Sequence, residues 1–397
     1  MWESIINFFE STGIVRLFTS SDDPWMWVKT LAMYAIVCVL VYLAVVKQYE
    51  PLLLLPIAFG MLLANLPGAN LIDTELFLSE GPLDIVKVVQ EGGLLDFLYL
   101  GVKLGIFPAL IFMGVGAMTD FTALIANPKS LLIGASAQIG VFLAFSGAVL
   151  SGVFSPQEAA AIGIIAGADG PTAIQVTKEL APSLLGSIAI AAYSYMALIP
   201  MIQPPIMRAL TTKKERLIKM TALRRVSKTE RLIFPVLVTV VVALIVPDAV
   251  MLVGFLMFGN ILNVCGVTDR LSQTAQNGLM NAITIFLGVT VGATASAENF
   301  LRIETFLIII LGFLAFAVAT ASALLFAKLM CFVTGGKINP LIGAAGVSAV
   351  PMAARMAQKV GAEADPTNFL LMHAMGPNVA GIIGSAVAAG VFLSWNW

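Results

Sequence analysis

Long apolar stretches recur along the whole chain, each separated from the next by a few polar residues. The clearest cover residues 27–46, 131–153, 184–207, 234–246 continuing into 251–264, and 306–333. A helix that crosses a bilayer needs about 20 consecutive apolar residues, and most of these stretches reach that length. The pattern predicts an all-α polytopic membrane protein. The composition agrees, because 59% of the 397 residues are hydrophobic and only 11% are charged.

Charge divides the chain almost in half. Residues 208–231 contain nine of the 22 Lys and Arg residues, and by the positive-inside rule this loop is expected on the cytoplasmic side of the cell membrane. We therefore predict a first membrane unit over 27–207 and a second over 232–397. Residues 1–26 contain acids and predict an interfacial amphipathic segment rather than a cleaved signal peptide.

The two membrane units share short stretches of similar sequence in the same order. Residues 58–68 match 257–267, 112–121 resemble 286–300, 163–173 match 343–353, and 182–197 align on 366–380. The offset between matched stretches changes mostly at about 73–96, which indicates an insertion in the first half. Such repeats are typical of transporters whose binding sites lie at the bilayer midplane between two halves. We expect two repeated halves, in the inverted arrangement, with broken or re-entrant helices that meet at midplane.

The matched stretches 158–178 and 339–359 are interrupted by glycine and proline. The first reads GIIAGADGPTA around Asp169. A carboxylate at the bilayer centre costs about 2.5–3.5 kcal/mol on insertion scales and usually marks an ion path or a charge pair. The break frees backbone carbonyls, so Asp169 and these oxygens could hold Na⁺ or a proton.

Further polar groups are expected near the second break and in the last apolar segment. They are Asn339, Ser348, Arg355, His373, Asn378 and Ser385, together with Tyr193, Ser194 and Tyr195 in the aligned part of the first half. Less specific interpretations stay open for these residues. Glycines and serines can serve helix packing, Arg355 can extend to the membrane interface, His373 can be an ordinary hydrogen-bonded residue, and Asp169 can pair with a Lys or Arg. The three cysteines show no metal-binding or disulfide spacing.

Four blocks carry a specific resemblance: GADGPT, AYSYMALIPMIQPPIMRALTT, NPLIGAAGVSAVPMAARM and NFLLMHAMGPNVAGIIGSAVAAG. From about residue 27 onward the chain resembles the membrane β subunit of the sodium-pumping, biotin-dependent decarboxylases that act on oxaloacetate, methylmalonyl-CoA or glutaconyl-CoA. The resemblance implies a subunit that decarboxylates carboxybiotin and exports Na⁺ while consuming a proton. It implies a biotin carrier subunit, a carboxyltransferase subunit and a small membrane anchor subunit as partners, a homo-oligomer within the complex, and no nucleic acid.

The resemblance also assigns roles to individual residues. Its sodium and proton positions fall on Asp169, Asn339, Ser348, Asn378 and Ser385. Arg355 matches the position linked to carboxybiotin or to the proton step, and Tyr195 and Gly343 match positions of functional importance. We accordingly expect Asp169, Ser348, Arg355 and Tyr195 to act in catalysis, and Arg355, Asn339 and Gly343 to contact the biotin group.

Two other function classes fit part of the pattern. A secondary Na⁺/organic-anion or Na⁺/H⁺ transporter would also have repeats, broken helices and a buried acid. A purely structural anchor for soluble subunits would need no carboxylate at midplane. This chain is not expected to determine which carboxylate substrate is used, because the resemblance places that specificity in the carboxyltransferase subunit.

Overall fold

The computed structural model describes residues 2–19, 23–73, 75–78, 85–349, 351–395 and 397. In the described residues the secondary structure is helical throughout, as the apolar pattern predicted. The first unit contains α1 (Trp2–Ser11), α2 (Gly13–Thr19), α3 (Met26–Val45), α4 (Pro51–Ala64), α5 (Glu75–Leu78), α6 (Ile85–Glu91), α7 (Leu94–Lys103), α8 (Ile106–Met118), α9 (Thr122–Ala126), α10 (Ser130–Ala137), α11 (Ile139–Leu150), α12 (Pro156–Gly163), η1 (Ile164–Gly167), α13 (Gly170–Leu180), η2 (Pro182–Leu184) and α14 (Leu185–Leu210).

The basic loop and the second unit follow. They contain α15 (Lys213–Arg216), α16 (Lys228–Ile245), η3 (Pro247–Ala249), α17 (Val250–Val264), α18 (Asp269–Thr274), the π-helix η4 (Ala275–Leu279), α19 (Met280–Ala293), α20 (Ala297–Phe300), α21 (Ile303–Val333), η5 (Pro340–Gly346), α22 (Met352–Ala364) and α23 (Leu371–Ser394). Part of the expected insertion at 73–96 and part of the N-terminal segment lie outside the described residues.

Among the residues that the structure describes, five helical segments are long and apolar enough to cross a membrane, and two bent pairs bring the number to seven if each pair is one span. α7 and α8 meet at 63° around Gly105, whose φ of 75° is in the left-handed region. α14 bends by 60° between Met196 and Leu198, just before three prolines inside the helix. Proline removes a helix hydrogen bond, which accounts for a bend of this size.

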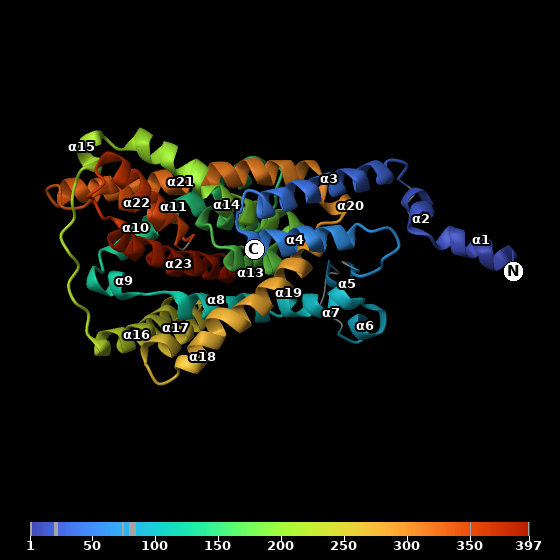
Figure 1. The fold of residues 1–397 in the computed structure, drawn as a ribbon, viewed down its shortest axis with the longest axis horizontal. Helices are drawn as coiled ribbons and strands as arrows, with labels where there is room; N and C mark the ends of the chain where they lie inside the picture. Colours follow the sequence, from blue (N-terminus) through green and yellow to red (C-terminus); the bar gives the residue numbers. More distant parts are fainter. Residues whose placement is uncertain (1, 20–22, 74, 79–84, 350, 396) are drawn as a thin grey trace.

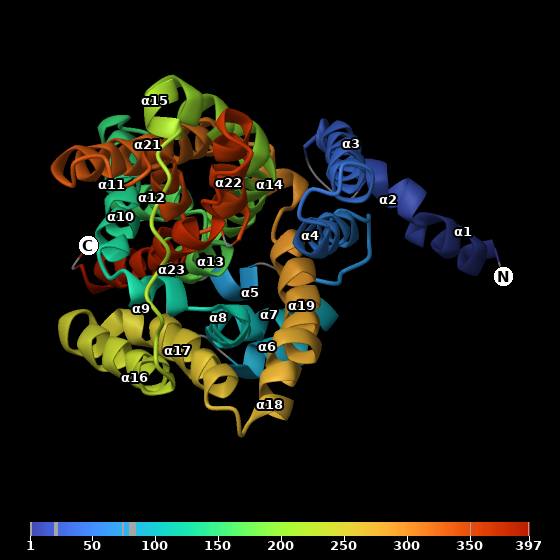
Figure 2. The same cartoon turned by 60° about the vertical axis from the view of Figure 1, so that its left-hand side comes forward.

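The helices run mainly along one long axis (Figure 1). The basic loop passes along one end of this axis, from α15 to α16, and α5 and α6 lie toward the other end. Turned by 60°, the structure shows α3, α4 and α19 packed together on one side and α10, α12, α13, α21, α22 and α23 gathered on the other (Figure 2). Two buried hydrophobic clusters match these two groups of helices.

Glycines from the matched stretches make close contacts in two helix pairs. A Cβ on Gly60 of α4 would lie 2.0 Å from the carbonyl oxygen of Val289 in α19, and one on Gly292 would lie 2.0 Å from that of Ile57. In α8 and α17, a Cβ on Gly116 would lie 1.8 Å from Leu256 O, and one on Gly259 would lie 1.9 Å from Met113 O. Each pair joins a helix of the first half to a helix of the second. The repeat matches α4 with α17 and α8 with α19, so it turns the α4–α19 pair into the α17–α8 pair. Two halves related by a two-fold axis would produce this pairing; the inverted repeat itself stays a prediction.

Candidate functional site: two broken helices around Asp169

The first break lies between α12 and α13. The helix narrows to the 3₁₀ segment η1, Ala168 takes a left-handed conformation with φ of 51°, and Asp169 is extended before α13 begins at Gly170. Pro171 lies in the first turn of α13, where its missing N–H costs nothing. The sequence GADGP therefore ends one helix and starts another with Asp169 between them.

The carboxylate of Asp169 is buried and accepts two side-chain hydrogen bonds. Asp169 is 9% exposed, and its Oδ2 accepts from Thr172 Oγ1 at 2.7 Å and from Ser385 Oγ at 2.9 Å. Within the described part of the chain, no ion pair with a Lys or Arg involves Asp169. The site thus combines one negative charge with neutral oxygen groups.

The second break touches the first. η5 ends at Gly346, and the backbone N–H of Ser348 donates to the carbonyl oxygen of Gly167 at 3.1 Å. Ser348 is 4% exposed. The structure therefore brings Ser348 beside the Asp169 break, as its place in the matched stretches predicted.

Helix α23 binds both breaks from one side. Asn378 Nδ2 donates to the carbonyl oxygens of Ala345 and Val347, at 2.9 and 3.0 Å, while Ser385 donates to Asp169. These two residues are seven positions apart, which is two turns and about 10 Å along the same helix face. The carbonyl oxygen of Gly346 would lie 2.3 Å from a Cβ on Gly381, so α23 approaches the second break closely only because this residue is glycine.

Asn339 lies at the opposite end of η5. Its Oδ1 accepts from Leu341 N, and its Nδ2 donates to the carbonyl oxygens of Arg216 and Ile218 in the basic loop. A 3₁₀ helix rises about 2 Å per residue, so the seven residues of η5 span about 14 Å between Asn339 and the stretch that contacts the first break. The structure does not bring Asn339 to Asp169, and its amide holds the basic loop instead.

Gly343 and Tyr195 both contact α21. A Cβ on Gly343 would lie 2.4 Å from the carbonyl oxygen of Ala323, so η5 can pack on α21 only with glycine there. The hydroxyl of Tyr195 donates to the carbonyl oxygen of Ile309, also in α21. In this conformation the Tyr195 hydroxyl is directed to α21 rather than to Asp169.

Arg355 is exposed near the start of α22, and its guanidinium makes no ion pair or side-chain hydrogen bond among the described residues. Lys359 is exposed one turn later. An unpaired guanidinium at the surface can bind an anion through two parallel hydrogen bonds. His373 is half-buried in α23, and its Nδ1 has no hydrogen-bond partner in the described structure.

Sequence reasoning gave no site role to two neighbours of Asp169, Thr172 and Tyr193, although it expected Tyr193 among the polar groups of the first half. Thr172 lies one helical turn after the acid in GADGPT, and this i to i+3 spacing was the available signal. Tyr193 is fully buried against the start of α13, where a Cβ on Gly170 would lie 2.5 Å from its hydroxyl. Tyr193, two residues before the predicted Tyr195, therefore faces the first break.

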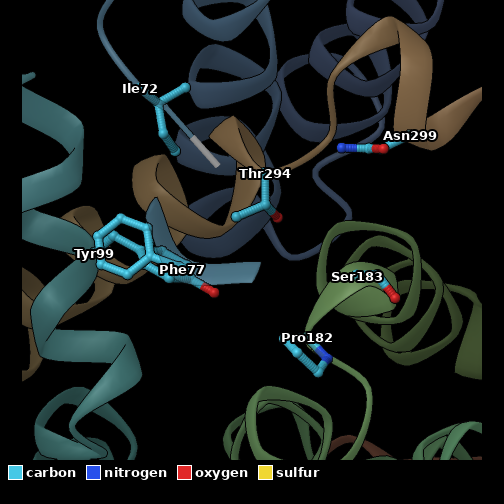
Figure 3. A pocket seen from close by; sticks show the side chains of 7 residues that line it. All are labelled: Ile72, Phe77, Tyr99, Pro182, Ser183, Thr294 and Asn299. Carbon is cyan, nitrogen blue, oxygen red and sulfur yellow. The ribbon is translucent and has the colours of Figure 1, made fainter. Parts of the chain in front are cut away.

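A separate pocket lies beyond the end of α13 (Figure 3). It is lined by Ile72, Phe77, Tyr99, Pro182, Ser183, Thr294 and Asn299. None of the residues predicted for the site lines this pocket. The polar groups that meet at Asp169 instead form a closed centre within the packed helices.

The fold and the centre define a class of protein: a polytopic helical membrane protein whose described residues enclose a carboxylate, without a cationic partner, between two interrupted helices. Comparison with known proteins gives the family. The model of the Na⁺-transporting oxaloacetate decarboxylase beta subunit matches residues 29–396. The chain belongs to this family of decarboxylase beta subunits.

Relatives of three substrate types are similar over most of their length. The chain is 58% identical to the methylmalonyl-CoA decarboxylase subunit beta of Propionigenium modestum, with 99% of each chain covered. It is 55% identical to the glutaconyl-CoA decarboxylase subunit beta of Acidaminococcus fermentans, covering 91% of this chain and 92% of the relative. It is 47% identical to the oxaloacetate decarboxylase beta chain of Haemophilus ducreyi, with 99% of each covered. These names support the sodium-pump interpretation rather than the secondary transporter.

Proposed function

We propose that this subunit decarboxylates carboxybiotin presented by a biotin carrier subunit and couples that step to the export of Na⁺, with consumption of a proton. One observation carries the proposal: Asp169 is a buried carboxylate without a cationic partner among the described residues, held at the junction of two broken helices. An uncompensated buried charge is costly, and a cation or a proton removes that cost. Na⁺ and H⁺ are therefore the natural alternating occupants.

Oxygen groups near the two breaks would suit an alkali cation. In this proposal Ser385 and Ser348 would supply hydroxyls, the breaks would supply backbone carbonyls, and Asn378 would supply an amide oxygen that no hydrogen bond occupies in the described structure. Hard cations prefer such oxygen ligands. The Ser385 hydroxyl now donates to Asp169; when a cation binds, it can rotate and offer a lone pair.

The first turn of α22, which follows the second break, is the proposed contact for the biotin group. Carboxybiotin is an anion, and Arg355 offers an exposed guanidinium that no described side chain pairs with. Asn339 ties the start of η5 to the loop, and Gly343 lets η5 pack on α21, so both would fix the segment that leads to the second break and to Arg355. Ser348, seven residues before Arg355, then lies between the anion contact and the Asp169 break.

The chemistry balances with one proton. The bond between the carboxyl carbon and the ureido nitrogen breaks, CO₂ leaves, and the electron pair stays on nitrogen, which takes up a proton. In our proposal that proton comes through Asp169 and Ser348, and its arrival displaces Na⁺. A bound cation lowers the pKa of neighbouring groups, so binding of Na⁺ and of a proton at one centre oppose each other.

The same assignment implies surroundings for the chain. The biotin carrier and carboxyltransferase subunits would dock on the side of the basic loop, which the positive-inside rule makes cytoplasmic. A small membrane anchor subunit and further copies of this chain would complete the complex in the cell membrane. The basic loop is fixed against the second unit by Arg208–Glu363 and Lys219–Asp365 ion pairs of 2.7 and 2.9 Å, and this ordered loop would form part of the docking surface.

The test is Na⁺-stimulated decarboxylation by the purified complex, with oxaloacetate, methylmalonyl-CoA and glutaconyl-CoA each offered as substrate. Activity on one of them that requires Na⁺ and is abolished by avidin supports the proposal. Avidin-resistant Na⁺ transport by this chain alone would support the secondary transporter instead.

A further inference from the structure

Gln138 is a polar residue in the middle of an apolar span. It lies between α10 and α11, eight residues into the 21-residue segment Ser130–Leu150. Gln138 is 7% exposed. Polar residues at this depth are expensive and usually mark a functional path.

The amide of Gln138 is unequally satisfied. Its Nε2 donates to the carbonyl oxygen of Gly134 at 3.5 Å, but its Oε1 has no hydrogen-bond partner in the part of the chain that the structure describes. A buried acceptor without a partner loses the solvation it would have in water, so native structures rarely keep one without a bound group.

This free oxygen lies beside the Asp169 break. A Cβ placed on Gly167, two residues before Asp169, would lie 3.9 Å from Gln138 Oε1 and 3.1 Å from Ser385 Cβ. The Gln138 amide also crosses Gly384, where a Cβ would lie 3.0 Å from its Nε2. Gln138 and Ser385, the residue that donates to Asp169, therefore flank the same glycine.

Neighbouring helices fix this position. A Cβ on Gly134 would lie 2.5 Å from Ala380 Cβ in α23, and one on Gly140 would lie 2.4 Å from Ala319 Cβ in α21. α10 and α11 are therefore held against α23 on one side and α21 on the other. Gln138 sits at the junction with little freedom to move its oxygen away.

We propose that Oε1 of Gln138 is a further ligand of the Na⁺ ion that Asp169 binds. This inference rests on the proposed function, because it concerns the same cation. Gln138 brings an oxygen from a third part of the fold, so that α10–α11, the first break and α23 surround the ion. A neutral amide oxygen adds a ligand without a second negative charge, which leaves the exchange of Na⁺ for one proton at Asp169 intact.

The test measures Na⁺ binding without turnover. The purified complex is melted at a series of NaCl concentrations, with choline chloride keeping the ionic strength constant, because a ligand of the folded state raises the melting temperature with its concentration. Gln138→Met keeps the side-chain shape and removes the oxygen. It should raise the Na⁺ concentration for half-maximal stabilisation about tenfold or more. Gln138→Glu keeps the oxygen and adds charge, and should lower that concentration several-fold at pH 8.

Gln276→Met is the matched control. The Gln276 amide is half-buried and donates to the carbonyl oxygen of Ala117 at 2.8 Å, in another part of the fold. The control should leave the Na⁺ dependence unchanged.

Three results would overturn the inference. Gln138→Met could bind Na⁺ like the parent protein. Gln138→Glu could bind Na⁺ as weakly as Gln138→Met. Neither side chain can donate to Gly134, so a purely structural role of the amide would be lost in both variants. If Gln138→Met does not fold, an unchanged Na⁺ concentration in Gln138→Glu alone refutes the inference. A parent complex with no Na⁺-dependent stabilisation would instead refute the proposed function, and the ligand role with it.

Discussion

Ser385 and Asp169 are 216 positions apart in the sequence, and the Ser385 hydroxyl donates to the Asp169 carboxylate at 2.9 Å. This bond joins the last long helix, α23, to the break in the first half. The site therefore exists only when both halves are packed together, and its strength should depend on residues of each.

Ser385→Ala should weaken Na⁺ binding while leaving the fold in place. When Na⁺ binds, the Ser385 hydroxyl would turn its oxygen to the cation, so the loss of this ligand should raise the Na⁺ concentration for half-maximal activity about tenfold or more. Na⁺ titration of decarboxylation by the purified complex measures this. Ser394→Ala is the control, because Ser394 is on the same helix, exposed, and donates only to Val391 O. An equal change of this Na⁺ concentration in both variants would show that Ser385 is not part of the site.

Arg355→Ala should slow the decarboxylation of carboxybiotin and spare Na⁺ binding. Without its guanidinium the anion loses a charge-assisted contact, and we expect a fall of about ten- to hundredfold. ¹⁴C-labelled carboxybiotin should then accumulate on the carrier, while Na⁺ still raises the melting temperature. Lys359→Ala, one turn later and equally exposed, should behave like the parent. If Arg355→Ala abolishes Na⁺ stabilisation instead, the guanidinium belongs to the cation centre.

Gly343→Ala should destabilise the second break. The added methyl group would lie 2.4 Å from the carbonyl oxygen of Ala323, and overpacking of this kind costs about 1–3 kcal/mol. Thermal melting should show a loss of several degrees together with reduced activity. Gly147→Ala is a clean comparison, since nothing lies within 4 Å of the added methyl there. Parent-like melting of Gly343→Ala would mean that η5 does not press on α21.

The contact of the basic loop with the α22–α23 connection should persist into acid. Hydrogen bonds from Thr367 and from Lys219 lower the pKa of Asp365 from its usual value to about 2. Because folding lowers the pKa of Asp365, its carboxylate stabilises the contact at pH values above the unfolded pKa near 3.8. This contribution is lost as the pH falls toward 2. Pepsin cleavage of the loop should therefore increase between about pH 4 and 2 in the parent. In Asp365→Asn cleavage should already be faster at about pH 4, and a parent-like profile would contradict the role of this carboxylate.

The sequence was sufficient to predict the broken helix and its buried acid, because glycine, proline and aspartate are all disfavoured inside an apolar membrane helix. It was less informative about partners. Repeat matching grouped Asn339 with Asp169, yet the Asn339 amide contacts the basic loop at the far end of η5, which spacing alone does not give. Gln138 was one of a few polar residues in an apolar stretch, and the role proposed for it depends on which glycines of distant helices lie beside it.

The orientation of side chains was also beyond the sequence. Tyr193 and Tyr195 are two residues apart on α14, so they face different neighbours: Tyr193 packs on Gly170, and Tyr195 donates to Ile309 O. Resemblance selected Tyr195, but only the helix bend and the packing of α21 determine where each hydroxyl is directed in this conformation.

The most direct test of the central claim is Na⁺ uptake into inverted membrane vesicles that contain the complex with Asp169→Asn. The amide keeps the shape of the side chain and removes its charge, so substrate-driven Na⁺ uptake should fall to background while carboxyl transfer to biotin continues at the parent rate. Uptake that survives the substitution would show that the ion does not depend on the Asp169 carboxylate, and the account of the site would be wrong.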